Sequence, residues 1–509
     1  MKLSVLFSYI SKYFPLVVLI IIPFCALWIR DSFAIFSSSA TYRVLIVWLE
    51  IMFVASFMAC HLRSVPSLQT VLKSRLFLLF LLWQTSAFVS VLVAPFPWPA
   101  LIRYIEILSH CAFGWCLYRY LLIFKSKRRF VVRGLFVAFI YAVFLIVLLW
   151  NVLDKPQNFN WATELPCFDN IRHFGYFIVA IIPLGYLPLL NNNKTKLPPI
   201  ANLVLSFLIL TTAWGVVFWQ GGRGCLISAV CGVSLLLLFE KGKWRKFLIF
   251  SLVCVICGFL FSKNFQYNAQ VSAVSRMNIA KIDNLNSFSS SRLVMYKKGL
   301  QQTWEINPWF GVGPDGYRYL RPRPLPVYVQ PHGIIPQIII EWGLLGSTFF
   351  LLFIGAFVRK WHQREQNDAI HVLSKASLCA LVIHSLVDGV FYHPFSLLTV
   401  AYIIPLTANM NSEITEEKLK GKSWSLIFLI LFSFVMLLHS YVVYVQKEGQ
   451  PTDFSTSLIQ VFPSYIDTSW WIFKDDSTEN RRKYIEIGRK FSSLPGFYDT
   501  LEERYLLTD

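Results

Sequence analysis

Long apolar stretches alternate with short charged loops over most of the chain. A run of roughly seventeen or more apolar residues can cross about 30 Å of hydrocarbon as a helix. The pattern therefore predicts an all-α, polytopic membrane protein with about thirteen transmembrane helices. The predicted spans lie near residues 14–29, 44–60, 77–94, 101–124, 134–153, 173–190, 200–219, 224–239, 247–262, 335–358, 374–389, 395–410 and 425–446.

Composition supports the same class, because 56% of the residues are hydrophobic and only 15% are charged. No small-residue cleavage site follows the first apolar run, so we interpret it as an uncleaved first helix rather than a signal peptide. Nearly all of the cysteines lie inside apolar runs. This placement indicates neither a disulfide framework nor a thiolate metal site.

Lysine and arginine are concentrated in alternate short loops, for example at 125–133 and 241–246, and the positive-inside rule places such loops in the cytoplasm. The N-terminus is then cytoplasmic, and a long loop at 263–334 faces the opposite side. We expect a transmembrane domain at 1–446, which includes this loop, and a small helical appendage at 447–509. The appendage carries aromatic residues and mixed charges but no catalytic motif.

A polar stretch at 289–345 carries dense ordering signals. Its apolar residues recur at three- and four-residue steps, with Ser291 as the cap, and predict a helix that begins at Arg292 and stops at Asn307-Pro308. The helix macrodipole disfavours a cation at the first residue, so Arg292 makes best physical sense there beside an anion. A solvated arginine at a helix start is the alternative interpretation.

Two further residues are candidates for the same site. Arg223 lies in a Gly-Gly-Arg-Gly turn between two predicted spans, where it can face an anion or simply snorkel to the membrane surface. His332 lies just before a predicted span and close in sequence to the arginines of the loop. Its imidazole is the best general-base candidate in this loop, although a loop histidine taken alone is more often structural.

Other polar residues could support such a site. Gln337 and Glu341 lie roughly on one face of the next span, and Asp388 lies near the outward end of its own span with His384 one turn earlier. A buried helix–helix pair or an interhelical hydrogen bond is the competing account. The remaining candidates are cations on the same side, the last three of which fit anionic lipid as well as phosphate: Arg172, His173, Arg318, Arg321 and Arg323.

Two patterns carry less weight. Arg103, Glu106 and His110 share one helix face and form either a second polar patch or an intrahelical ion pair. The sequence GVGPDG at 311–316 looks like a phosphate-binding loop, but neither a strand nor a Gly-Lys-Ser/Thr sequence accompanies it. We interpret it as a tight turn.

The candidate chemistry is rich in arginine and has no Asp/Glu cluster of the kind that holds Mg²⁺ or Mn²⁺. Guanidinium groups can bind a diphosphate bidentately and stabilise it as a leaving group. The implied substrate is a lipid diphosphate whose head lies at the outer interface. We therefore expect membrane lipids among the partners, but no metal, no cofactor and no nucleic acid.

The sequences SSSRLVMYKKGLQQTWEINPWFGVGPDGY and QPHGIIPQIIIEWGLLG resemble the signature region of the bacterial superfamily of O-antigen ligases, O-antigen polymerases and protein O-oligosaccharyltransferases. The resemblance implies a metal-independent, GT-C-like glycosyltransferase of the inner membrane that moves a glycan from undecaprenyl diphosphate to an acceptor in the periplasm. The family's essential arginines match Arg223 and Arg292, and its catalytic histidine matches His332. The family commonly has Asn after that histidine, where this chain has Gly333.

Within the superfamily, our first expectation is an O-antigen ligase of lipopolysaccharide biosynthesis, which transfers the glycan to a lipid A-core hydroxyl with inversion. The outward tail slightly favours a large acceptor. The alternatives are an O-antigen polymerase, with a second lipid-linked glycan as acceptor, and a protein O-oligosaccharyltransferase, with a pilin Ser or Thr. A lipid-glycan flippase or secondary transporter would instead have paired broken helices and ionisable groups near the bilayer centre.

Overall fold

The computed structural model describes residues 3–32, 39–61, 74–161, 165–168, 170–190, 198–239, 244–265, 292–320, 330–362 and 368–408. These residues form helices and no strand, which confirms the predicted all-α class. The α-helices are α1 Leu3–Ser32, α2 Ser39–His61, α4 Arg75–Leu92, α5 Pro97–Ile123, α6 Arg128–Val152, α7 Ile171–Leu184, α8 Leu187–Leu190, α9 Pro199–Gln220, α10 Arg223–Phe239, α11 Trp244–Lys263, α14 Arg292–Ile306, α15 Ile334–His362, α16 Ala369–Ser385 and α17 Pro394–Leu406. Three short 3₁₀ helices accompany them: η3 Lys125–Lys127, η4 Pro156–Asn158 and η6 Gly316–Tyr319.

A helix overlaps each predicted span up to 395–410. Within the described residues, eight helices are long and apolar enough to cross a membrane, and three more apolar helices are shorter. The chain is thus a multi-pass membrane protein. The predicted span at 425–446 and the appendage at 447–509 lie outside the described residues, so the count of about thirteen and the GT-C-like arrangement stay predictions.

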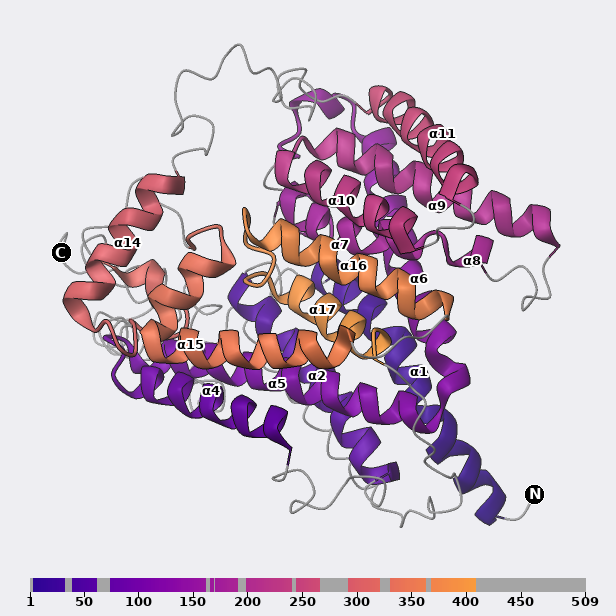
Figure 1. Cartoon of the computed structure of the whole chain (residues 1–509). Coiled ribbons are helices and arrows are strands. Elements are labelled where there is room, and N and C mark those ends of the chain that lie inside the picture. Colours follow the sequence, from indigo (N-terminus) through magenta and orange to yellow (C-terminus); the bar gives the residue numbers. More distant parts are fainter. Residues whose placement is uncertain are drawn as a thin grey trace, which may run out of the picture.

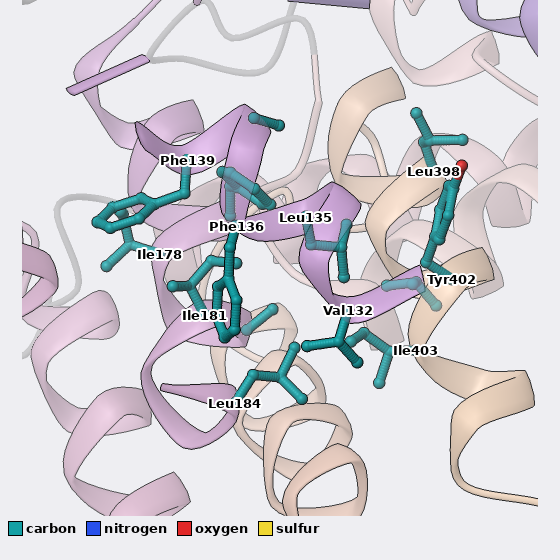
Figure 2. Close-up of a cluster of buried hydrophobic side chains, with 14 of the residues drawn as sticks. Val132, Leu135, Phe136, Phe139, Ile178, Ile181, Leu184, Leu398, Tyr402 and Ile403 are labelled. Atoms are coloured by element: carbon teal, nitrogen blue, oxygen red, sulfur yellow. The ribbon is translucent and has the colours of Figure 1, made fainter. Parts of the chain in front are cut away.

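The helices differ in how much of their surface the protein covers. The segment Ile171–Leu190, which contains α7, lies at the centre of the bundle, and 83% of its most apolar part is buried. For the segment Arg245–Lys263 of α11 the buried share is 28%. Apolar side chains of α6, α7 and α17 interlock in the core, among them Phe136, Ile181 and Tyr402 (Figure 2). The exposed faces of the outer helices are also apolar, as expected for a surface in contact with lipid.

The helices around residues 386–393 come from different parts of the bundle. Helix α14 lies beside the beginning of α15, while α9 and α11 pack together at the opposite side (Figure 1). Helix α16 packs against both α7 and α10, and α17 returns along α5. The turn between α16 and α17, at 386–393, is therefore surrounded by helices from distant parts of the sequence.

Helix α15 is broken at Gly343, whose φ of 64° and ψ of −170° lie outside the helical region. In an unbroken helix, the amides of Leu344 and Leu345 would donate to the carbonyls of Ile340 and Glu341. The break separates these four backbone groups. Because an unpaired backbone group is unfavourable in a membrane protein, each of them needs another partner.

The segment 308–313 supplies all four partners. The exchanged bonds run from Leu344 N to Pro308 O (2.9 Å), from Leu345 N to Trp309 O (3.1 Å), from Val312 N to Ile340 O (3.0 Å) and from Gly313 N to Glu341 O (2.9 Å). Gly311 and Gly313 have positive φ angles of 74° and 86°, which confirms that GVGPDG forms a turn. This turn docks into the break of α15, and it does so with its backbone.

Candidate functional site

The Asp388 carboxylate, in the turn at 386–393, is the centre of the candidate site. Its Oδ1 atom lies 2.9 Å from His332 Nδ1 and accepts a hydrogen bond from the Tyr176 hydroxyl at 2.8 Å. The amide of Gly389 also donates to Oδ1, at 2.9 Å. Its Oδ2 atom lies 3.5 Å from Arg292 Nη2. One carboxylate thus joins side chains from α7, α14 and the residues before α15.

The surroundings of Asp388 keep it ionised. Burial alone would raise the pKa of its carboxyl, but the hydrogen bond and charge of His332 and the charge of Arg292 outweigh burial and hold the pKa well below its ordinary value. An ionised carboxylate can only accept hydrogen bonds, so the proton between the two residues lies on His332 Nδ1. In the neutral imidazole the lone pair is then on Nε2, which is the basic nitrogen.

The backbone of His332 is held in an uncommon conformation, with a φ of 50°. The Tyr296 hydroxyl, on α14, donates to the His332 carbonyl at 2.8 Å. Burial raises the pKa of this hydroxyl, so it remains protonated and able to donate. Helix α14 therefore positions both Arg292 and the histidine.

Arg292 is the first residue of α14, as the sequence predicts, while the proposed cap Ser291 lies outside the described residues. Its Nη1 donates to the carbonyl of Val387, and its Nη2 pairs with Asp388. The side chain is 21% exposed. A guanidinium has five N–H donors, so these two contacts leave donors on the same group for a ligand.

Arg223 is the first residue of α10 and follows Gly221, whose φ is 70°. A Cβ added to Gly224 would lie 2.9 Å from Val387 Cγ2 and 3.2 Å from His384 Cδ2. The beginning of α10 thus packs directly on the residues that precede Asp388. The structure brings the three main predicted residues, Arg223, Arg292 and His332, to the same turn.

Two of the supporting candidates lie at the beginning of α7. The Asn170 side chain caps this helix by accepting from the Arg172 amide at 2.8 Å. The ring of His173 lies 4.1 Å from the ring of His393 and 5.5 Å from that of Tyr176. Arg172 and His173 are therefore next to the site, one turn before the tyrosine that contacts Asp388.

Arg318 belongs to a second group of charges. Its Nε lies 3.2 Å from Asp315 Oδ2, and the Tyr392 hydroxyl donates to the same carboxylate. The structure places Arg318 in a pair with Asp315 and Tyr392. Arg321 and Arg323 lie outside the described residues.

Gln337 and Glu341 are both buried on α15. The Gln337 amide donates to the carbonyl of Gly333 at 3.1 Å, as in a first helical turn. The carbonyl of Glu341 accepts from the hydroxyl of Ser90 and the amide of Gly313. The Glu341 carboxyl also accepts from the backbone of Asp315 and from the Gln337 side chain. Glu341 therefore faces the Asp315 side of α15.

Arg103, Glu106 and His110 form both an intrahelical ion pair and a second polar patch. Arg103 pairs with Glu106 within α5, and His110 Nδ1 lies 2.5 Å from Glu50 on α2. Arg43, also on α2, lies 3.5 Å from the Glu106 carboxylate. The helical spacing thus produces an intrahelical ion pair that extends into a polar network between two helices.

Three arginines from three helices bind backbone carbonyls of the turn that carries Asp388. The contacts are Arg292 with Val387 O, Arg103 with Phe391 O and Arg43 with Tyr392 O. A buried carbonyl outside a helix needs such a donor. The network on α2 and α5 therefore positions the turn, at a distance from the carboxylate.

Within the described ranges, no three His, Cys, Asp or Glu side chains lie close enough to hold a metal ion. Arginines supply the permanent positive charges that contact this turn. The arrangement offers a base, a carboxylate that orients it, and neighbouring cations.

Fold and site together define a multi-pass membrane protein with a His–Asp pair flanked by arginines. Residues 206–351 match the family model described as O-antigen ligase, which confirms the resemblance to this superfamily. Its members are glycosyltransferase-like enzymes. The matched region contains Arg223, Arg292 and His332, whereas Tyr176 and Asp388 lie outside it. No curated protein matches the chain.

Proposed function

We propose that the chain is an O-antigen ligase of the bacterial inner membrane. It transfers a glycan from undecaprenyl diphosphate to a hydroxyl of lipid A-core, without a metal and with inversion at the anomeric carbon. The observation that carries the proposal is the Asp388 carboxylate, which contacts His332 Nδ1 on one oxygen and Arg292 on the other. A base and a diphosphate-binding cation are thereby held side by side.

In the proposed reaction, the acceptor oxygen forms a bond to the anomeric carbon and its proton passes to His332 Nε2. The bond from that carbon to the diphosphate oxygen breaks, and its electron pair stays on the diphosphate. Asp388 stabilises the imidazolium that forms, and it keeps Nδ1 protonated throughout. The products are the glycosylated acceptor and undecaprenyl diphosphate.

Arg223 and Arg292 bind the diphosphate in this proposal. Arg223 is the first residue of α10 and Arg292 is the first residue of α14, and both helices begin beside the turn at 386–393. One anion can therefore meet both side-chain charges and the backbone N–H groups at two helix starts. Their permanent charge offsets the negative charge that develops on the leaving group. Arg172 and His173 add positive or polar groups at the beginning of α7.

The membrane orientation follows from the lysine- and arginine-rich short loops, which we assign to the cytoplasm. The turn at 386–393 and the loop that carries Arg292 and His332 then face the periplasm. Donor and acceptor are both lipids, so both can reach a site at the periplasmic interface by diffusion in the membrane. The GT-C-like class is part of the same proposal.

A transfer assay in detergent tests the proposal. Purified protein receives a labelled undecaprenyl-diphosphate-linked glycan and lipid A-core, and we expect label on lipid A-core. The variant His332→Ala should lower the initial rate by about a hundredfold or more, because it removes the base. Full activity in this variant would overturn the assignment. Transfer in detergent, where no compartments exist, would also separate an enzyme from a flippase or transporter.

Lysine substitutions test the two arginines. Arg223→Lys and Arg292→Lys keep the charge but lose bidentate geometry, so we expect a large loss of transfer in each. Arg359→Lys, at the exposed far end of α15, is the matched control and should keep full activity. Wild-type rates in both site variants would contradict diphosphate binding by these residues.

A deletion strain identifies the acceptor. Loss of long chains from lipid A-core on a lipopolysaccharide gel is the result that we expect. Retention of a single repeat unit would instead identify an O-antigen polymerase. Loss of a pilin-linked glycan with normal lipopolysaccharide would identify a protein O-oligosaccharyltransferase.

A further inference from the structure

We propose that Tyr176 is a positioning residue that limits the proton affinity of His332 through the carboxylate that they share. The proposal rests on the role of His332 as the base, and it extends the site to a residue outside the family match. Tyr176 acts on His332 through Asp388 in this proposal. Its hydroxyl donates to Asp388 Oδ1 at 2.8 Å, and the same oxygen lies 2.9 Å from His332 Nδ1.

Three donors converge on Oδ1: the Tyr176 hydroxyl, His332 Nδ1 and the Gly389 amide. A carboxylate oxygen has two lone pairs, so the three donors compete for the negative charge of one atom. Each additional donor draws negative charge away from the contact with the histidine. Tyr176 therefore weakens the stabilisation that Asp388 gives to a protonated His332.

The ring of Tyr176 is fixed from several sides. The side chain is 1% exposed, and the ring of His384 meets it nearly edge-on at 5.1 Å. The neighbouring residue, Gly175, allows close packing of the Gln220 amide, which would lie 3.0 Å from a Cβ at that position. A rigid ring holds the hydroxyl in one place, as a positioning role requires.

The titratable and charged groups around the pair come from every adjacent element. Arg292 on α14 contacts the other carboxylate oxygen, and His384 on α16 lies against Tyr176. Further groups near the pair are Arg172 and His173 at the beginning of α7, Arg223 at the beginning of α10 and His393 before α17. Tyr176 differs from these groups because it donates to the same carboxylate oxygen, Asp388 Oδ1, that His332 contacts.

The chemical consequence concerns the fraction of enzyme with an available base. At neutral pH, the reaction needs His332 unprotonated at Nε2 before the acceptor hydroxyl gives up its proton. A stronger pull from Asp388 would protonate the histidine in advance and lower that fraction. The Tyr176 hydroxyl counteracts this pull, and the proton from the acceptor still ends on Nε2.

Histidine NMR tests the proposal without any turnover. The whole protein is labelled at histidine ¹³Cε1, and the His332 signal is assigned by its loss in His332→Gln. For Tyr176→Phe, which keeps the ring and removes the donor, we expect the titration midpoint of that signal to rise by about half a pH unit or more. Replacement of Tyr176 by a fluorinated tyrosine, a stronger donor, should move the midpoint the other way.

A matched substitution controls for the loss of a tyrosine hydroxyl. Tyr141→Phe makes the same change in α6. It should leave the midpoint in place. An unchanged midpoint in Tyr176→Phe, or an equal shift in Tyr141→Phe, would overturn the proposal. Failure of the proposed function would appear separately, as transfer that survives His332→Ala.

Discussion

Gly333 and Tyr296 fit one another at the His332 backbone. A Cβ on Gly333 would lie 2.7 Å from the Tyr296 hydroxyl oxygen, the atom that donates to the carbonyl of His332. The superfamily commonly has Asn where this chain has Gly333. In this chain, an asparagine would displace the tyrosine that holds the histidine.

A double-mutant cycle measures this fit. Gly333→Ala should lower transfer strongly, because the new methyl group pushes the Tyr296 hydroxyl away from His332. Tyr296→Phe removes the clashing oxygen, so the second substitution should cost less in the Gly333→Ala background than alone. Initial rates of the four proteins give the coupling. Strict additivity of the two effects would contradict the contact.

The break in α15 predicts a contrast between two glycines of that helix. Gly343 has positive φ, and a Cβ there would lie 2.4 Å from Gly311 N, whereas a Cβ on Gly355 would meet nothing within 4 Å. Gly343→Ala should therefore destabilise the protein by several degrees in thermal unfolding. Gly355→Ala should leave it unchanged or raise its stability by about 1 kcal/mol, because alanine favours a helix. Equal effects of the two substitutions would contradict the close packing of residues 308–313 against Gly343.

Asp388 predicts a pH-dependent stability difference. Its folded-state pKa lies well below the ordinary value, through His332 and Arg292 acting against burial, so its ionisation stabilises the fold above the unfolded pKa of about 4. That contribution is lost as pH falls through the folded-state pKa. Asp388→Asn should thus melt lower than wild type between about pH 5 and 8, and the two should converge in acid.

Thermal unfolding followed by tryptophan fluorescence over this pH range checks the sign. Asp154→Asn, at an exposed position, serves as the control and should follow wild type throughout. A difference between Asp388→Asn and wild type that widened in acid would contradict the ionised state of Asp388.

The buried pair of Arg103 and Glu106 should be destabilised more by loss of the arginine alone than by loss of both charges. Arg103→Met leaves the buried Glu106 with Arg43 at 3.5 Å and His110 at 3.7 Å, and it removes the donor to Phe391 O. Loss of one partner of a buried pair typically costs about 3 to 5 kcal/mol. The double variant Arg103→Met/Glu106→Gln should lose less stability than Arg103→Met, because no buried carboxylate is left at position 106. Thermal midpoints test the order, and a double variant less stable than Arg103→Met would contradict it.

Hydropathy was sufficient to locate the helices, because each apolar run of membrane length must satisfy its own backbone. The helix from Arg292 to Ile306 was equally predictable, since spacing and Asn307-Pro308 set its limits. The break at Gly343 was not predictable in this way, because the apolar pattern continues through it. Only the position of residues 308–313 in space explains how the break is tolerated.

Within the site, charged and titratable residue types in the sequence indicate Arg223, Arg292, His332 and Asp388, which the fold brings together. The role of Asp388 as the shared acceptor depends on contacts between four elements and has no sequence signal. Tyr176 was missed because an aromatic residue in an apolar run is typical of a core. A weak hint was its place one turn after Arg172.

The exchanged bonds of α15 also bear on biogenesis. The amides of Leu344 and Leu345 pair with carbonyls of 308–313, whereas the rest of 344–362 is an ordinary apolar helix that pairs its own backbone. We therefore expect a defect in the docking turn to leave an inserted protein whose His332 is misplaced, rather than a protein that the membrane rejects.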